Sequence, residues 1–296
     1  MPRLVDLFCG CGGMSLGFQE AGFDIIESFD NWAPAIATYS ANFNHPITSL
    51  DLSDSDRIIS HLKDRDIDII IGGPPCQDFS IAGKRDFLGN RANLTLSYAK
   101  AVTSLAPKWF VMENVYNIQK SPIFQEAIKI FSEAGYGLNI RILDASLMGV
   151  PQQRKRCFVI GKMGAKDNFL DQIIDSKLST SHTTVRQYLG ETLGTDFYYM
   201  HPRSYNRRAI FSIDEPSSTI RGVNRPMPAT YKFHPADKCT DYSKIRALSY
   251  IERSYLQTFP NGYKFKGSNA QIEQQIGNAV PVKMAEFVAT IIFENF

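Results

Sequence analysis

The sequence lacks three features that would place it in a special class of protein. No apolar run approaches the length of a membrane span, and a strand-like segment begins at Arg3, which leaves no room for a signal peptide. The five cysteines are odd in number and show no Cys-x-x-Cys spacing, so neither a disulfide framework nor a metal site is expected. These absences favour a protein of the reducing cytoplasm that contacts no membrane.

The sequence also has little net charge, since 32 basic and 30 acidic residues leave a formal charge of only +2. Basic residues nevertheless gather in two segments. Residues 152–166 hold five Lys or Arg and no acid, and residues 200–232 hold six against two acids. A solvated surface is the common explanation of such runs. Aromatic residues interrupt the second run, which instead favours a surface that binds nucleic-acid phosphates.

Apolar strand-like runs alternate with helix-like segments through the first half of the chain. This alternation predicts an α/β fold with a doubly wound, mostly parallel sheet covered on both faces. Strands are expected at 3–8, 24–29, 67–73, 108–115, 138–145 and 156–162, and helices near 14–21, 33–43, 55–64, 94–105, 121–134 and 282–293. From 163 to 245 the pattern decays, which predicts a second, smaller and irregular domain.

The segment 72–80 presents Cys76 directly after an apolar strand, where an open α/β sheet does its chemistry. Pro74 and Pro75 fix the backbone there, and the glycines before them leave room for a close ligand. A lone cysteine is more often a small buried hydrophobe. The rigid, polar surroundings favour a nucleophile instead.

Four further segments occur in a fixed order along the chain. They are Asp6–Phe18, Met112–Val115, Gln152–Arg156 and Gly277–Pro281. Together with the Cys76 loop they resemble the motifs of the bacterial DNA (cytosine-5)-methyltransferases. The resemblance implies a Rossmann-like catalytic domain over 1–161 plus 275–296. It also implies a target-recognition domain over 162–274, with an organising helix near 246–258.

The glycine-rich turn after the first strand could by itself equally bind a nicotinamide or a flavin. The resemblance instead implies S-adenosylmethionine as the cofactor. Asp30 is then the ribose-binding carboxylate, although the family more usually has glutamate followed by an aromatic residue, where this chain has Asn31; Glu27 is the alternative. The expected cofactor-binding residues are Phe8, Gly10, Cys11, Gly12, Gly13, Asp30, Asn31, Asp51, Leu52, Pro75, Leu94 and Asn278.

The resemblance also implies a covalent mechanism. The Cys76 thiolate would add to carbon 6 of cytosine, and Glu113 would act as the acid at ring nitrogen 3. Arg156 would contact the cytosine carbonyl, with Arg154 supporting it near the phosphate and the sulfur. A solvated hairpin is the alternative reading of these arginines. Because carbon 6 is hidden inside a stacked duplex, the target base would have to be flipped out.

The sequence therefore predicts a monomeric enzyme that methylates cytosine in a short duplex DNA sequence. A restriction endonuclease would be its partner in function without physical contact. A tRNA cytosine-5 methyltransferase and a catalytically silent DNA-binding relative are the alternatives. The expected substrate- and DNA-binding residues are Pro75, Gln77, Ser80, Asn114, Val115, Gln152, Arg203, Arg207, Arg208, Thr219, Arg221 and Arg225.

Overall fold

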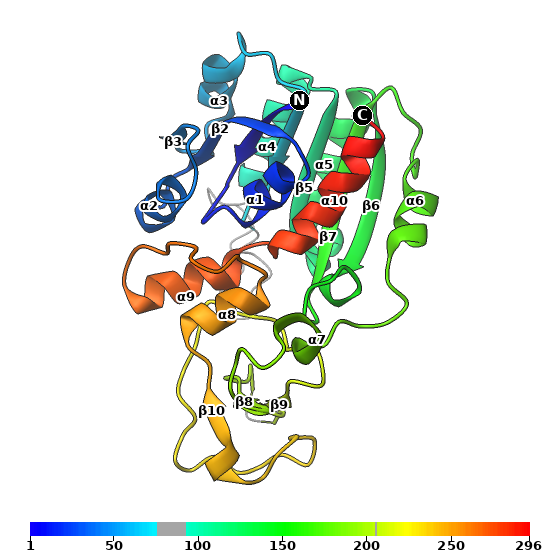
Figure 1. Ribbon diagram of the computed structural model, residues 1–296. Helices are drawn as coiled ribbons and strands as arrows, with labels where there is room; N and C mark the ends of the chain where they lie inside the picture. The colour runs from blue at the N-terminus through cyan, green and yellow to red at the C-terminus, as the bar shows by residue number, and fades with distance from the viewer. Residues whose placement is uncertain (76–92, 205) are drawn as a thin grey trace.

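The computed structural model of the chain describes residues 1–75, 93–204 and 206–296. A larger lobe is built on a seven-stranded sheet, and a smaller lobe below it contains a three-stranded sheet (Figure 1). The predicted nucleophile Cys76 and the predicted substrate contacts Gln77 and Ser80 lie outside the described residues.

The larger sheet has the strand order β3-β2-β1-β4-β5-β7-β6. Its strands are β1 (Arg3–Leu7), β2 (Asp24–Asp30), β3 (Ile47–Ser49), β4 (Ile69–Gly72), β5 (Trp109–Val115), β6 (Tyr136–Asp144) and β7 (Lys155–Met163). Every neighbouring pair is parallel except the two that involve β7. The predicted mostly parallel sheet is confirmed. Strand β3 was not predicted, because its three partly exposed residues form no apolar run.

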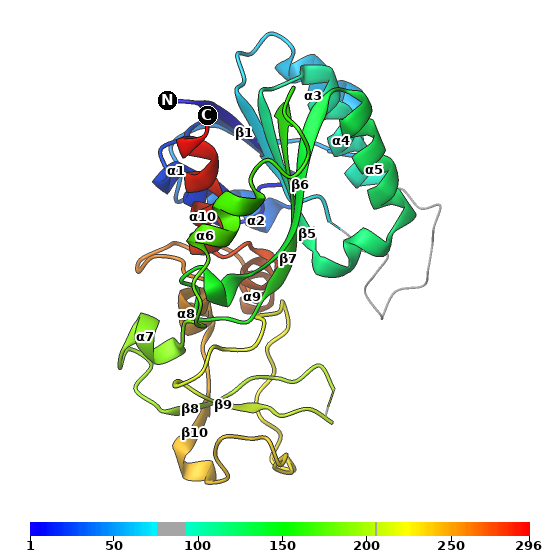
Figure 2. The same ribbon diagram turned by 90° about the vertical axis from the view of Figure 1, so that its right-hand side faces the viewer.

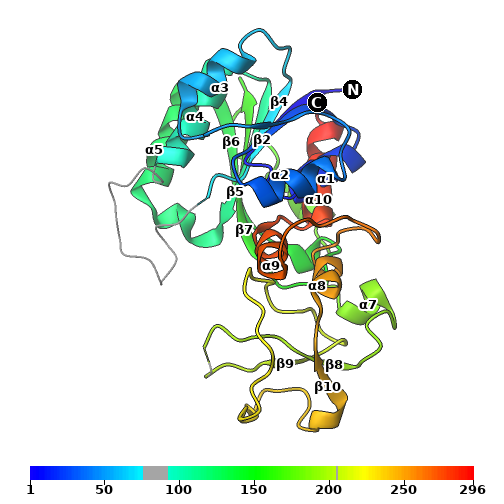
Figure 3. The ribbon, with the colours of Figure 1, turned by 90° about the vertical axis from the view of Figure 1, so that its left-hand side faces the viewer.

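Helices cover both faces of this sheet (Figure 2, Figure 3). One face carries α1 (Gly13–Glu20) and α10 (Val282–Glu294), the other carries α3 (Ser55–Leu62), α4 (Asn93–Leu105) and α5 (Pro122–Glu133), and α2 (Ala33–Ser40) lies near β3. The start of α5 is as predicted: the Ser121 hydroxyl oxygen accepts the backbone N–H of Ile123, and Pro122 occupies the first turn.

The last two helices form an apolar stretch, 269–294, that is long enough to cross a membrane by length and composition alone. It consists of α9 (Asn269–Asn278) and α10, which are separated at Pro281. The side chains of Met284, Val288 and Ile292 are buried in the core of the larger lobe. The apolar character of the stretch therefore serves internal packing.

The smaller lobe contains β8 (Phe197–Tyr199), β9 (Ile210–Ser212), β10 (Ile245–Ala247), α7 (Val185–Leu189) and α8 (Tyr250–Leu256). Leu170 and Ile174, at α6 (Asp171–Lys177), still belong to the core of the larger lobe. The chain therefore leaves that core near residue 178, later than the expected boundary at 162.

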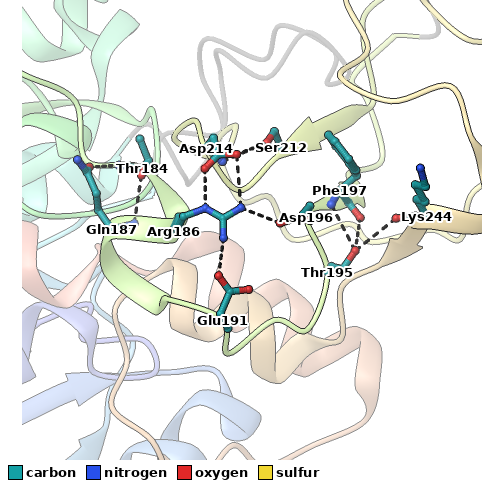
Figure 4. Close-up of polar contacts among 10 residues, drawn as sticks. All are labelled: Thr184, Arg186, Gln187, Glu191, Thr195, Asp196, Phe197, Ser212, Asp214 and Lys244. Carbon is teal, nitrogen blue, oxygen red and sulfur yellow. Dashed lines mark hydrogen bonds and ion pairs between the residues drawn. The ribbon is translucent and has the colours of Figure 1, made fainter.

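Arg186 joins several segments of the smaller lobe through ion pairs (Figure 4). Arg186 of α7 lies 2.6 Å from Asp214, 2.7 Å from Asp196 and 2.5 Å from Glu191. Glu191 and Asp196 lie in the segment between α7 and β8, and Asp214 follows β9, so one guanidinium joins α7 to the turns around β8 and β9. Thr184 and Gln187 close the start of α7 with a capping box.

Candidate active site

A cavity of about 410 Å³ lies at the carboxyl ends of β1, β2, β4 and β5. Ligands bind at this edge in open α/β sheets. The cavity is lined by most of the predicted cofactor residues, of which Pro75 is also a predicted substrate contact, and by four further predicted catalytic or substrate-binding residues. They are Phe8, Gly10, Cys11, Gly13, Asp30, Asn31, Leu52, Pro75, Leu94 and Asn278, with Glu113, Asn114, Val115 and Arg156. The fold thus gathers both predicted sets at one place.

The turn between β1 and α1 lines one side of the cavity. Gly10 and Gly12 have φ angles of +56° and +92°, which favour glycine over residues with a side chain. A Cβ on Gly12 would come within 2.4 Å of the Phe43 ring. Gly12 does not line the cavity, contrary to prediction; it allows the turn to pack closely. Tyr263, which the sequence reasoning missed, donates its hydroxyl to the carbonyl oxygen of Cys11.

Backbone N–H groups hold Asp30 at the end of β2. One carboxylate oxygen accepts from Gly10 and the other from Asn31 and Trp32, each at 2.8 Å. The family's aromatic residue was expected at position 31, where this chain has Asn31. Trp32, one position later, lines the cavity instead. The alternative Glu27 is buried elsewhere and bonds Thr48 at 2.6 Å, which leaves Asp30 as the ribose-binding candidate.

Asp51 does not line the cavity, so its predicted role as a cofactor-binding residue requires correction. Its side chain is exposed and accepts hydrogen bonds from the backbone N–H and the hydroxyl of Ser53, at 3.0 and 2.8 Å. These bonds lower the pKa of Asp51 and use the carboxylate to shape its own turn. The neighbouring Leu52 is buried and lines the cavity as predicted.

Glu113 and Arg156 form a buried ion pair at the cavity, with 3.0 Å between Oε1 and Nε. Burial raises the pKa of Glu113, although the charges of Arg156 and Arg154 oppose the rise. A Cβ on Gly73 would lie 3.4 Å from Glu113 Oε2. The chain that leads to Cys76 therefore passes close to a carboxyl group able to hold a proton.

Asn114 fixes that same chain segment. Its side-chain amide donates to the Pro74 carbonyl oxygen at 2.8 Å, while its own oxygen accepts the N–H of Val115 at 2.9 Å. The end of β5 and the start of the Cys76 loop are thus joined by one side chain. Such bonding restricts the positions from which the loop can begin.

Arg154 and Gln152 are placed differently from the prediction. Arg154 is 1% exposed, and its guanidinium donates to the carbonyl oxygens of Ile220, Gly277 and Ala279. Gln152 is fully buried and bonds Ile220, Leu256 and Gln257. Neither side chain can reach a phosphate or a base from this position. Both join the lobes, which corrects the predicted catalytic role of Arg154 and DNA contact of Gln152.

The predicted DNA-binding residues of the smaller lobe fall into two groups. Three are already engaged: Arg208 binds Glu215 through two bonds of 2.9 Å, Arg221 donates to the His201 carbonyl oxygen, and Thr219 donates to the Gln153 carbonyl oxygen. Arg203, Arg207 and Arg225 are exposed and have no carboxylate partner among the described residues. The second group is the one available to a polyanion.

Three of the four cysteines in the described part of the chain are poor nucleophiles. Cys9, Cys11 and Cys157 are buried, and burial raises the pKa of Cys11 and of Cys157 to about 12. Their thiols stay protonated at neutral pH. Across residues 1–75, 93–204 and 206–296, no cluster of His, Cys, Asp and Glu is suited to a metal ion.

Comparison with known proteins agrees with this geometry. Residues 2–294 match the family of C-5 cytosine-specific DNA methylases. The chain is 54% identical to the Type II methyltransferase M.HindV of Haemophilus influenzae over 295 residues, which cover 99% of this chain and 97% of that protein. It is also 54% identical to the Type II methyltransferase M.HgiDI of Herpetosiphon aurantiacus over 97% of this chain and 93% of that protein.

A solved structure of the S. pombe Dnmt2 methyltransferase has the same fold. It superimposes with a TM-score of 0.75 at 19% identity and covers 100% of this chain and 99% of that one. The family match over residues 2–294 and the two relatives at 54% identity show that the chain belongs to the C-5 cytosine-specific DNA methylase family and is a DNA (cytosine-5)-methyltransferase of bacterial type.

Proposed function

We propose that the protein transfers a methyl group from S-adenosylmethionine to carbon 5 of a cytosine flipped out of a short, specific duplex DNA sequence. The Cys76 thiolate adds to carbon 6, which makes carbon 5 nucleophilic. After methylation, loss of the carbon-5 proton expels the thiolate and restores the aromatic ring. Glu113 hydrogen-bonds ring nitrogen 3 and stabilises the intermediate.

The buried pair of Glu113 and Arg156 is the observation that carries this proposal. A carboxyl group whose pKa is raised by burial can donate a proton or a hydrogen bond near neutral pH. Arg156 offers donors for the cytosine carbonyl oxygen next to it. The pair lies beside Gly73, which precedes the proposed nucleophile by three residues in the sequence, and this favours an acid and a thiolate that act on the same base.

The cavity has the chemistry that S-adenosylmethionine requires. Asp30 provides an anchored carboxylate for the ribose, and Trp32, Leu52 and Leu94 provide apolar surface for the adenine ring. When bound, the cofactor supplies an electrophilic methyl group on a sulfonium. Asp30, Trp32, Leu52 and Leu94 would hold it in the cavity that Glu113 also lines.

Duplex DNA is the substrate we favour over tRNA. The family match names DNA, and the two relatives at 54% identity are named Type II methyltransferases, which supports this choice. We propose in addition that the enzyme is cytoplasmic and monomeric and protects DNA from a restriction endonuclease. A catalytically silent relative would have no need to retain a buried Glu113–Arg156 pair beside Gly73. Labelled-methyl transfer to duplex DNA and to tRNA, measured side by side, separates the three readings.

The covalent step is tested with a duplex that carries 5-fluorocytosine at the target. Fluorine cannot leave carbon 5 as a proton does, so elimination stops and the enzyme stays attached. We expect an adduct that resists denaturation, needs the cofactor and is absent in Cys76→Ser. Wild-type enzyme that methylates normal DNA but forms no adduct with the fluorinated duplex would overturn the mechanism.

A further inference from the structure

Helix α9 touches both the cavity and a loop of the smaller lobe. Gly277 and Asn278 line the cavity at one end of the helix. The loop of residues 221–225 lies against the same helix: a Cβ on Gly277 would be 2.0 Å from the backbone nitrogen of Gly222. This separation leaves no space for a side chain, so the two backbones are in direct contact.

A buried ion pair attaches this loop at both ends. Glu273 of α9 and Arg253 of α8 are paired, with only 9% and 2% of their surfaces exposed. Arg253 donates to the Arg221 carbonyl oxygen at 2.6 Å. Asn224 donates to Glu273 Oε1 at 2.8 Å and to the Leu248 carbonyl oxygen at 3.1 Å. We call Arg253, Glu273 and Asn224 the clasp.

The clasp is poorly explained by stability alone. Burying two charges costs several kcal/mol, and apolar residues of the same volume often stabilise a protein as well or better. What the ion pair adds is direction, because each bond to the loop has a fixed geometry. A polar clasp therefore suits a loop whose exact position matters.

The residue next to the clasp is a free cation. Arg225 follows Asn224 directly, is exposed, and has no carboxylate partner in the described part of the chain. Burial and the nearby charge of Arg203 lower the pKa of Arg221, which shows that the positive charges here are crowded. An unneutralised cluster of this kind is suited to DNA phosphates and to the acceptor edge of guanine.

We propose that Glu273 and Asn224 are positioning residues for DNA sequence discrimination, which hold the 221–225 loop so that Arg225 meets one base pair in a fixed register. The inference rests on the proposed function, since it needs duplex DNA as the substrate. A guanidinium distinguishes bases only when its fork is correctly oriented, whereas attraction to phosphate tolerates movement. Loss of the clasp should therefore reduce discrimination more than overall DNA affinity.

Asn224→Ala tests this directly, because it removes one of the two attachments of the loop and leaves the Arg253–Glu273 pair and its bond to Arg221 in place. Asn224→Asp is the second variant, since it cannot donate to Glu273 and repels it. Plasmid DNA is methylated to equal extent by each enzyme and mapped by bisulfite sequencing. We expect the ratio of methylation at wild-type sites to that at sites with one changed base to fall about tenfold. Cofactor affinity by calorimetry should stay at the wild-type value.

Asn261→Ala is the matched control. Asn261 is exposed, accepts the Tyr255 hydroxyl and lies outside the loop, so its loss should leave the methylation map unchanged. The double variant Asn224→Ala with Arg225→Ala gives a readout that a merely structural role would not produce. If Asn224 acts through Arg225, the double variant should discriminate no worse than Arg225→Ala alone.

The outcomes separate this inference from the proposed function. A wild-type enzyme that methylates a defined site, with both Asn224 variants keeping its full discrimination, would overturn the positioning role. Additive losses in the double variant would overturn action through Arg225. Failure of the wild-type enzyme to methylate any duplex DNA would instead overturn the proposed function itself, whatever the variants show.

Discussion

The larger lobe buries Phe110 between aromatic rings, whereas the smaller lobe places Arg186 among three carboxylates. Phe110 is fully buried, and its ring centroid lies 4.1 Å from that of Phe131. Arg186 remains partly exposed and joins its lobe through ion pairs (Figure 4). The smaller lobe also holds apolar clusters, but its strands have only three residues each and supply less apolar surface than the longer strands and helices of the larger lobe.

The two lobes also differ in where their charged side chains lie and in what those side chains contact. In the larger lobe, buried carboxyl groups such as Asp6 and Glu113 are few, and Glu113 lies at the proposed chemistry. In the smaller lobe, ion pairs such as those of Arg186 add to the apolar clusters around Tyr198 and Ile210, and only some arginines in the described part of that lobe have no carboxylate partner. The two lobes should therefore respond differently to loss of volume, to pH and to salt.

Phe110→Ala should have the largest effect on stability. Removing a fully buried phenylalanine ring costs about 3–5 kcal/mol of unfolding free energy, since the cavity left behind refills only in part. Denaturant unfolding measures the loss. Phe293→Ala, in which the replaced ring is 41% exposed, is the control and should cost clearly less. Equal losses would show that the apolar core is not what holds the larger lobe.

Glu113→Gln should reduce turnover by roughly a hundredfold or more, because the amide cannot act as the acid at the cytosine ring. Cofactor affinity should remain nearly unchanged. Asp30→Ala should do the reverse, weakening cofactor binding by removing the anchored carboxylate. Single-turnover kinetics and calorimetry separate the two effects. Loss of cofactor binding in Glu113→Gln, with none in Asp30→Ala, would exchange their roles.

Asp6→Asn should flatten the dependence of stability on pH. Burial raises the pKa of Asp6 to about 8, so the folded protein holds this proton where the unfolded chain releases it. The stabilisation is complete below the ordinary aspartate pKa and is lost as pH rises through about 8, at about 1.4 kcal/mol per pH unit.

Unfolding free energies at pH 6, 7 and 8 test the prediction for Asp6. The asparagine variant should lack this slope, because it keeps an oxygen that can accept from Ser15 but carries no titrating proton. Asp24→Asn, which alters an exposed carboxylate at the start of β2, is the control. Identical slopes in wild type and Asp6→Asn would contradict the prediction.

Arg186→Lys should have the smallest of these effects and the clearest salt dependence. Lysine keeps the charge but not the fork that contacts three carboxylates at once. We expect a lower midpoint of thermal unfolding at low salt, and a difference from wild type that shrinks as salt screens the charges. A difference independent of salt would mean that Arg186 acts through packing of its stem.

The sequence predicted the parts of the fold that carry their own periodicity. Six of the seven strands of the larger sheet and the helices on its faces follow from apolar runs. Helices α6, α7 and α9 were not predicted, because they are short or polar and show no clear apolar periodicity of their own. The cavity residues followed from motif order, with Trp32 displaced by one position.

The wrong predictions share one physical cause. A motif shows that Arg154, Gln152 or Arg208 is charged or polar, but it does not show whether the side chain faces outward. Their partners lie far away or depend on a turn: Arg154 bonds carbonyl oxygens 66, 123 and 125 positions along the chain. Such pairings exist only after the lobes have packed, so local pattern cannot reveal them.

The close approach of Gly277 and Gly222 restricts how this enzyme could be given a new target. A recognition module exchanged at the ends of the smaller lobe would bring its own loop against α9. Any residue larger than glycine at position 277 would collide with that loop, 2.0 Å from the nitrogen of Gly222. If α9 of this protein were kept and the loop and α8 were replaced, Glu273 would also lose its partners Asn224 and Arg253. The transferable unit therefore has to include the loop, α8 and α9 together.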